Sequence, residues 1–216
     1  MFPDRIEAGK QLATRLTPLL DGPAVVLALP RGGVPVAAEI ARKHDLPLDL
    51  ILVRKVGLPG REELAVAAIA GPDGADMVVN KEIADAAGLD RAAINRLAEP
   101  ARAELRRRRA LYLGDRPPVP LTGKVAIIVD DGIATGATMH AAIKSIRNQG
   151  AIQIILAVPV ASADVLERFR AEVDQVVCLE TPFPFCAVGT HYRSFSQVGD
   201  EEVKASLAAF PSPPEA

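Results

Sequence analysis

Residues 125–139 read Val-Ala-Ile-Ile-Val-Asp-Asp-Gly-Ile-Ala-Thr-Gly-Ala-Thr-Met, and this stretch decides the fold. The five apolar residues at its start predict a strand that is buried on both faces, as in a parallel sheet. Two adjacent carboxylates, Asp130 and Asp131, follow the strand, and a loop of small residues then opens a helix. Gly132 and Gly136 permit positive φ and a close approach of a ligand to the backbone. The loop amides and the helix N-terminus therefore point at one place, which we expect to bind an anion.

Polar side chains in this loop indicate what else could be bound there. The hydroxyls of Thr135 and Thr138 are donors suited to phosphate oxygens. Asp130 and Asp131 are acceptors, suited to a sugar diol or, through water, to Mg²⁺. The loop is not a Walker loop, because no Lys-Ser/Thr pair follows the glycine.

On both sides of this unit, short apolar runs alternate with amphipathic segments. We predict helices over residues 4–20, 34–43, 90–113, 137–148 and 163–171, and strands over residues 24–29, 49–53, 65–70, 77–79, 125–129, 152–158 and 175–179. This alternation implies parallel crossovers and an α/β fold, a parallel Rossmann-like sheet flanked by helices. Pro100 is expected to kink or interrupt its helix, and residues 58–63 are expected to form a mobile loop. We expect one domain over residues 1–216 with a disordered tail over residues 211–216.

Candidate binding residues follow the carboxyl ends of several predicted strands. They are residues 31–33, Lys55, residues 130–138 and residues 183–185. Ligand sites in an open parallel sheet lie beyond those ends, so these segments should converge on one crevice. Arg31 could make a bidentate contact with phosphate oxygens.

Composition limits the classes of protein and partner. Apolar residues make up 49% of the 216 residues and the formal net charge is −2, which gives no global attraction to nucleic acid or an anionic membrane. We predict no signal peptide and no membrane span. Cys178 and Cys186 are expected to be reduced, small buried residues of a cytoplasmic protein. The histidines show no metal-ligand spacing. The arginine run at residues 106–109 is interpreted as a solvated face or subunit contact, with an RNA or phosphate patch as the alternative.

The apolar run, the two acidic residues and the Thr-Gly-x-Thr that follows at residues 135–138 together resemble the PRPP-binding motif of type I phosphoribosyltransferases. The resemblance implies that Asp130 and Asp131 hold the ribose hydroxyls. It also implies a cradle for the 5′-phosphate, made of Ile133, Ala134, Thr135, Gly136, Ala137 and Thr138. Hypoxanthine–guanine enzymes usually carry an acidic residue at the position of Ala134, so the alanine speaks against a 6-oxopurine acceptor.

The segment from Arg31 to Ala70 resembles an uncharacterised bacterial phosphoribosyltransferase-like family with an Arg-Lys-x-Gly-x-Pro-Gly segment. By this resemblance the pyrophosphate loop consists of Arg31, Gly32 and Gly33, and Lys55 adds a cation. The Arg-Gly-Gly stretch of relatives can contain a cis peptide without proline. Arg61 would belong to a lid that closes over the site.

The residues after the last strand are expected to bind the acceptor base. Phe185, with Val188 behind it, occupies the position where purine enzymes stack a ring on the base, and Phe183 is the alternative. Packing against the sheet edge would explain the same aromatic residues equally well.

The resemblance as a whole implies a type I fold with a small hood and transfer of 5-phosphoribose from PRPP to a nitrogenous base. Asp130, Asp131, Lys55 and Arg31 would be the catalytic residues, with Mg²⁺ held mainly through PRPP and also by the two aspartates through water. It further implies a homodimer that works in nucleotide metabolism, with nucleic acid an unlikely partner. Two other functions stay open: a PRPP or nucleotide sensor without turnover, and a hydrolase or phosphorylase of phosphoribosyl compounds.

Overall fold

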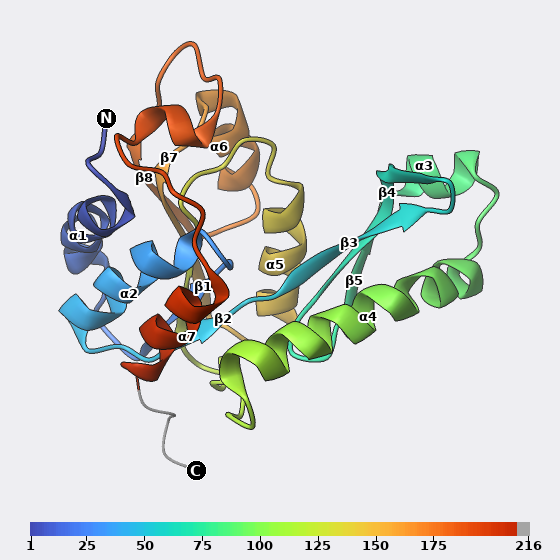
Figure 1. The fold of residues 1–216 in the computed structure, drawn as a ribbon, viewed down its shortest axis with the longest axis horizontal. Helices are drawn as coiled ribbons and strands as arrows, with labels where there is room; N and C mark the ends of the chain where they lie inside the picture. The colour runs from blue at the N-terminus through green and yellow to red at the C-terminus, as the bar shows by residue number, and fades with distance from the viewer. Residues whose placement is uncertain (211–216) are drawn as a thin grey trace.

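A five-stranded parallel sheet forms the centre of the computed structural model, which describes residues 1–210 (Figure 1). The strands lie in the order β2-β1-β6-β7-β8. They are β1 (Ala24–Ala28), β2 (Leu48–Leu50), β6 (Val125–Val129), β7 (Gln153–Val160) and β8 (Gln175–Glu180). Each pair of neighbours is parallel, so the carboxyl ends of all five strands meet at one edge.

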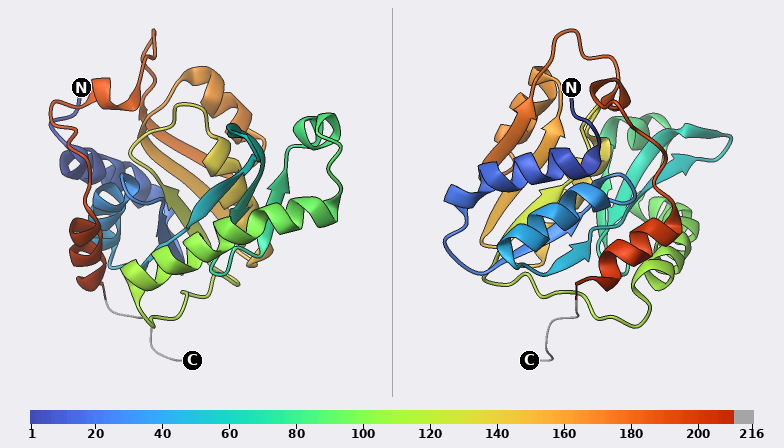
Figure 2. Two further views of the ribbon diagram at one scale, coloured as in Figure 1. Left: turned by 45° about the vertical axis from the view of Figure 1, so that its right-hand side comes forward. Right: turned by 60° about the vertical axis from the view of Figure 1, so that its left-hand side comes forward.

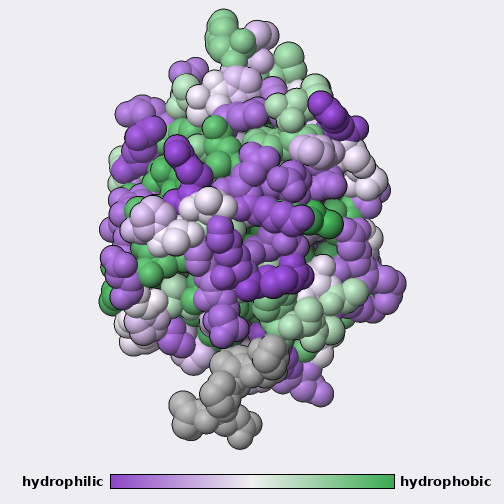
Figure 3. Space-filling view, turned by 90° about the vertical axis from the view of Figure 1, so that its left-hand side faces the viewer, coloured by the Kyte–Doolittle hydropathy of each residue, from purple (hydrophilic) through white to green (hydrophobic). Residues whose placement is uncertain are grey.

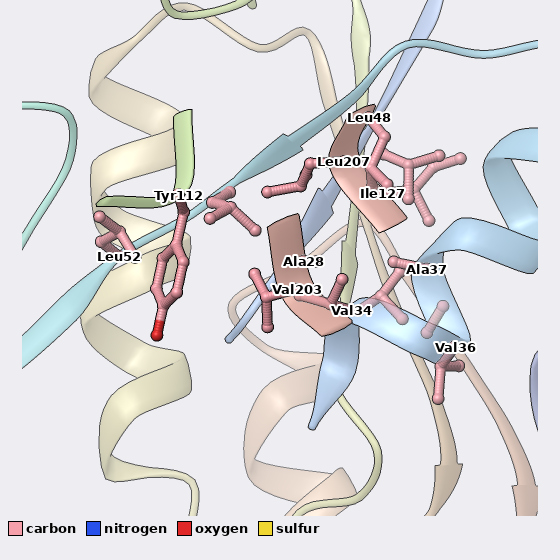
Figure 4. Close-up of a cluster of buried hydrophobic side chains, with 14 of the residues drawn as sticks. Ala28, Val34, Val36, Ala37, Leu48, Leu52, Tyr112, Ile127, Val203 and Leu207 are labelled. Atoms are coloured by element: carbon pink, nitrogen blue, oxygen red, sulfur yellow. The ribbon is translucent and has the colours of Figure 1, made fainter. Parts of the chain in front are cut away.

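Helices cover both faces of this sheet because its strands are apolar on both sides. On one face lie α1 (Arg5–Leu16), α2 (Gly33–His44) and α7 (Asp200–Ala208), and on the other α5 (Ala137–Asn148) and α6 (Ala163–Arg170). Val26 and Ala28 of β1 point to the first face, and Val25 and Leu27 point to the second. In Figure 4, side chains of α2 and α7 meet those of β1 and β6 in the core of the first face.

A second, smaller layer projects from the sheet as a hood (Figures 1 and 2). It contains the antiparallel strands β3 (Val53–Leu58), β4 (Arg61–Ala70) and β5 (Asp76–Val79), the short α3 (Lys81–Ala86) and the long α4 (Arg91–Leu113). Ile94, Ala98 and Leu105 of α4 are buried in the same cluster as Val56 of β3. The hood therefore shares the core of the first face rather than forming a separate one.

Short 3-10 turns and the termini complete the chain. The turn η1 (Thr17–Leu19) extends α1, and η2 (Val188–His191) follows β8. Phe2 pairs in a parallel bridge with Tyr192, so the start of the chain is attached to the segment after the last strand.

On the face that carries α1 and α2, hydrophilic side chains gather over the centre (Figure 3). None of the helices within residues 1–210 combines the length and the apolarity that a membrane span requires.

The predicted α/β fold with a flanked parallel sheet is confirmed, but several local predictions were wrong. The predicted interruption at Pro100 is absent: α4 runs from Arg91 to Leu113 with Pro100 inside it. Residues 58–63 are not a loop: β3 and β4 form a hairpin around a turn in which Gly60 has φ 74°. The sequence did not predict α3 or α7. The predicted tail over residues 211–216 lies outside the described residues.

Candidate active site

The two adjacent carboxylates lie at the carboxyl end of β6, in the middle of the sheet. The backbone amide of Asp131 donates to Oδ1 of Asp130 at 2.8 Å, which orients the first carboxylate. Nε of Arg5, at the start of α1, donates to Oδ2 of Asp131 at 2.8 Å. The hydroxyl of Tyr192 donates to the backbone carbonyl of Asp131 at 2.6 Å. The second aspartate is therefore held from two sides by segments far away in the sequence.

Burial dominates the electrostatics of this pair. It raises the pKa of Asp130 well above its usual range, and the neighbouring charge of Asp131 raises it further. Burial also raises the pKa of Asp131, although the hydrogen bond and charge of Arg5 oppose that effect. Burial likewise raises the pKa of the Tyr192 phenol, which therefore stays a hydrogen-bond donor. A cation or a ligand hydroxyl at this site would relieve the repulsion between the two carboxylates.

The Arg-Gly-Gly loop after β1 packs directly against these aspartates. A methyl group added at Gly32 would lie 2.1 Å from Oδ2 of Asp131, and one at Gly33 would lie 2.6 Å from the carbonyl oxygen of Val129. Glycine is therefore required at both positions for the two loops to meet. The cis peptide of this loop joins Pro30 to Arg31, one residue before the Arg31–Gly32 bond.

Arg31 lies half-buried at the entrance to α2. Its Nη1 is 3.6 Å from Oδ1 of Asp200, at the start of α7. The same oxygen accepts a hydrogen bond of 2.7 Å from the Tyr112 hydroxyl, and this bond lowers the pKa of Asp200. A pocket of about 350 Å³ opens between the two loops and the segment before α7, and its lining includes Arg5, Arg31 and Asp131.

The loop that follows Asp131 has the form expected of an anion cradle. Ile133 forms a bridge with Ala161 beyond the end of β7, and its amide donates to the carbonyl of Val160 at 3.0 Å. Gly136 has φ 81° and lies under Phe169, where a methyl group would come within 2.6 Å of the ring. Ala134 and Thr135 are exposed and Thr138 is half-buried. Within residues 1–210 neither threonine hydroxyl has a partner, so both are available as donors to a ligand.

Lys55 and Arg61 lie on the hood rather than in loops of the sheet. Lys55 is an exposed residue of β3, opposite Ala68 of β4, and not part of a loop that follows β2. Arg61 is the exposed first residue of β4, at the tip of the hairpin. Among the described residues neither cation forms an ion pair. The predicted convergence of four loops at the sheet edge therefore reduces to three loops, which follow β1, β6 and β8.

The predicted base-binding residues differ in their exposure. Phe183 is 99% exposed at the tip of the segment after β8. Phe185 is half-buried and its ring stacks on that of His191, with ring centroids 5.4 Å apart. Val188 packs against Gly132, since a methyl group there would lie 2.6 Å from Cγ1 of Val188. This contact brings the segment after β8 to the acidic loop.

Other predictions from sequence had mixed outcomes. Cys178 is partly buried, and burial raises its pKa to about 11, but Cys186 is exposed and its predicted burial was wrong. In the arginine run, Arg107 and Arg108 form ion pairs with Glu104 of the same helix. Within residues 1–210 no three His, Cys, Asp or Glu side chains cluster as metal ligands.

Sequence reasoning missed Arg5, Tyr112 and Asp200 as neighbours of the site. Their partners lie far away along the chain: Tyr112 and Asp200 are 88 residues apart, and Arg5 and Asp131 are 126 residues apart. No local pattern marks such pairs. The three acidic residues at the start of α7 are a typical helix-start signal and could have revealed that helix.

Comparison with known proteins identifies the family. The sequence profile described as the phosphoribosyl transferase domain matches residues 15–194. Proteins from two strains of Mycobacterium tuberculosis, provisionally named phosphoribosyl transferases, are 48% identical over 207 residues, which is 96% of this chain and 46% of theirs. The chain thus spans about half the length of these curated relatives. A hypoxanthine/guanine phosphoribosyltransferase of Methanospirillum hungatei is 30% identical over 63% of this chain and 53% of its own length.

A solved structure has the same fold over nearly the whole chain. The crystal structure of TT1426 from Thermus thermophilus is 42% identical, with a TM-score of 0.85, and covers 97% of this chain and 98% of that chain. The chain therefore belongs to the phosphoribosyl transferase family, a class of enzymes, and its architecture is the type I fold of that family.

Proposed function

We propose that this chain transfers 5-phosphoribose from PRPP to a nitrogenous base or a related acceptor and releases pyrophosphate. The observation that carries the proposal is the contact between two glycine-containing loops at the carboxyl edge of the sheet. Gly32 lies against the carboxylate of Asp131, so the predicted pyrophosphate loop and the predicted ribose-binding residue share one site. A ligand with a sugar between a phosphate and a pyrophosphate would need both loops at once.

Each part of the site has a distinct role in this reaction. The amides of residues 134–138 and the hydroxyls of Thr135 and Thr138 would bind the 5′-phosphate at the start of α5. Asp130 and Asp131 would accept hydrogen bonds from the ribose hydroxyls. Arg31 would take the leaving pyrophosphate, since a cation that is in place before the reaction would stabilise the charge that develops there. The transfer passes through an oxocarbenium-like sugar, so no covalent nucleophile is required.

The donor atoms near β6 fit Mg²⁺. The two aspartates offer hard oxygen ligands, and Mg²⁺ usually keeps several waters and binds through one or two carboxylates and substrate phosphates. When bound, Mg²⁺ would neutralise charge on the pyrophosphate. The hairpin of β3 and β4, with Lys55 and Arg61, is the segment that would close over the site and exclude water. We further propose that the protein acts in the cytoplasm, as a homodimer, in nucleotide metabolism.

For the acceptor we propose a class of base rather than one compound. Ala134 departs from the acidic residue usual in 6-oxopurine enzymes, which favours adenine or a pyrimidine. The Methanospirillum relative carries the name of a hypoxanthine/guanine enzyme, so these bases also belong in the test.

The deciding assay measures pyrophosphate release from PRPP with Mg²⁺ and a panel of purine and pyrimidine bases. Base-dependent release that is lost in Asp130→Asn supports the transferase and names the acceptor. Asp164→Asn, on the exposed first turn of α6, is the matched control and should keep full activity. Release without any base would support the hydrolase, and silence with PRPP still bound would support the sensor.

A further inference from the structure

The first residues of the chain are built into the wall of the site. The amide of Phe2 donates to the carbonyl of His191 at 2.8 Å, and the amide of Arg193 donates back to Phe2 at 2.9 Å. The amide of Ser194 donates to the carbonyl of Pro3 at 3.0 Å. These hydrogen bonds fix the point at which α1 begins, and therefore the backbone position of the residue that follows Asp4.

That residue is Arg5, and its guanidinium is held by two hydrogen bonds and one ring contact. Nε donates to Oδ2 of Asp131 at 2.8 Å, and Nη1 donates to the carbonyl of Ser196 at 2.8 Å. The guanidinium carbon lies 3.8 Å from the centre of the Phe195 ring, which is a cation–π distance. The side chains of Arg5 and Asp131 are 11% and 14% exposed, so water screens the pair little.

The contact with Arg5 decides which oxygen of Asp131 can serve a ligand. Arg5 takes Oδ2 of Asp131, which leaves Oδ1 to accept from a sugar hydroxyl. The amide of Asp131 takes Oδ1 of Asp130, which leaves Oδ2 of that side chain. Each carboxylate is thus held in place through one oxygen, and the two side chains lie close enough to interact with each other, an arrangement suited to two adjacent hydroxyl groups.

We propose that Arg5 is a positioning residue for ribose recognition: it holds Asp131 in the single orientation in which Oδ1 meets the sugar. The proposal rests on the proposed function, because it assigns Asp131 to the ribose. The proposal makes different predictions for two parts of PRPP. Loss of Arg5 should weaken binding of the sugar and leave binding of the pyrophosphate, which Arg31 holds, unchanged. A residue needed only for folding would make no such distinction.

The experiment compares two probes by calorimetry in buffer with Mg²⁺: ribose 5-phosphate and pyrophosphate. In Arg5→Met, whose apolar side chain can still pack on Phe195, the affinity for ribose 5-phosphate should fall about tenfold or more, the usual effect of losing a charge-assisted hydrogen bond. The affinity for pyrophosphate should change less than about twofold. Arg5→Lys keeps the charge without the planar fork and should give an intermediate loss for ribose 5-phosphate only. Arg15→Met, on the exposed side of the same helix, is the control and should bind both probes as the wild type does.

Each outcome decides the matter. Equal losses for both probes in Arg5→Met and Arg5→Lys would overturn the proposal, because Arg5 would then only support the fold. Unchanged binding of ribose 5-phosphate in both variants would overturn it as well. A wild-type protein that binds pyrophosphate but not ribose 5-phosphate would refute the proposed function itself, and the proposal for Arg5 with it.

Discussion

Replacing Gly32 with alanine tests whether the two loops of the site meet as the structure indicates. The new methyl group would lie 2.1 Å from Oδ2 and 2.6 Å from Cγ of Asp131, whereas ordinary van der Waals contact begins at 3.4 Å. The backbone at Gly32 has φ −60° and ψ −36°, which alanine adopts without strain. The effect of the substitution is therefore steric and falls on one carboxylate.

The magnitude follows from opposing terms. Overpacking of a closely packed contact costs about 1–3 kcal/mol, and loss of chain entropy in the unfolded state returns about 0.4–1 kcal/mol. We expect the free energy of unfolding to fall by about 1–2 kcal/mol, which lowers Tm by about 2–8 °C for a chain of this size. Ribose 5-phosphate should also bind about tenfold more weakly, because Asp131 must move away from Arg5.

Thermal unfolding and calorimetry of Gly32→Ala provide the measurement, with Gly22→Ala as the control. A methyl group at Gly22 would meet nothing within 4 Å, so that variant should be as stable as the wild type or slightly more so. If Gly32→Ala matches Gly22→Ala in both stability and binding, the two loops do not meet as described and the reasoning is refuted.

Three further predictions concern the surroundings of the site and the hood. Asp200→Asn keeps an acceptor for the Tyr112 hydroxyl but removes the carboxylate that lies 3.6 Å from Arg31. Pyrophosphate should therefore bind about two- to fivefold more tightly at low salt, and this gain should disappear at high salt. Calorimetric titrations with pyrophosphate that match the wild type at both salt concentrations would contradict this prediction. In the native protein at pH 8, a thiol reagent should react with Cys186 alone, because Cys186 is exposed and burial raises the pKa of Cys178 to about 11. Mass spectrometry that finds Cys178 labelled before the protein is unfolded would disprove this prediction. Pro100→Ala should raise the free energy of unfolding, measured in urea, by about 1–3 kcal/mol, because residue 100 of α4 regains a backbone N–H donor. A variant less stable than the wild type would argue against a regular helix at residue 100.

The sequence predicted the parts of the fold that depend on local pattern. Residues 125–129 are apolar and are followed by glycines and small residues, so the strand, the loop and the helix over residues 137–148 all have the predicted bounds. The Pro-Gly pair at residues 59–60 carried a turn signal that was interpreted as a loop, although apolar runs flank it as in a hairpin. Arg5 carried no signal at all, because its role arises from a carboxylate 126 residues further along the chain.

The large sequence separation between Arg5 and its partners also affects the order in which the protein can fold during synthesis. Phe2 and Arg5 leave the ribosome long before their partners at residues 191–196. Domains begin to fold while the chain is still being made, and contacts between residues far apart in the sequence must wait. The acidic loop therefore gains the support of Tyr192, and the contacts that fix Arg5, only after residues 191–196 have been translated. A nascent chain stalled before residue 191 would carry the binding loops and Arg5 without the segment that orients them.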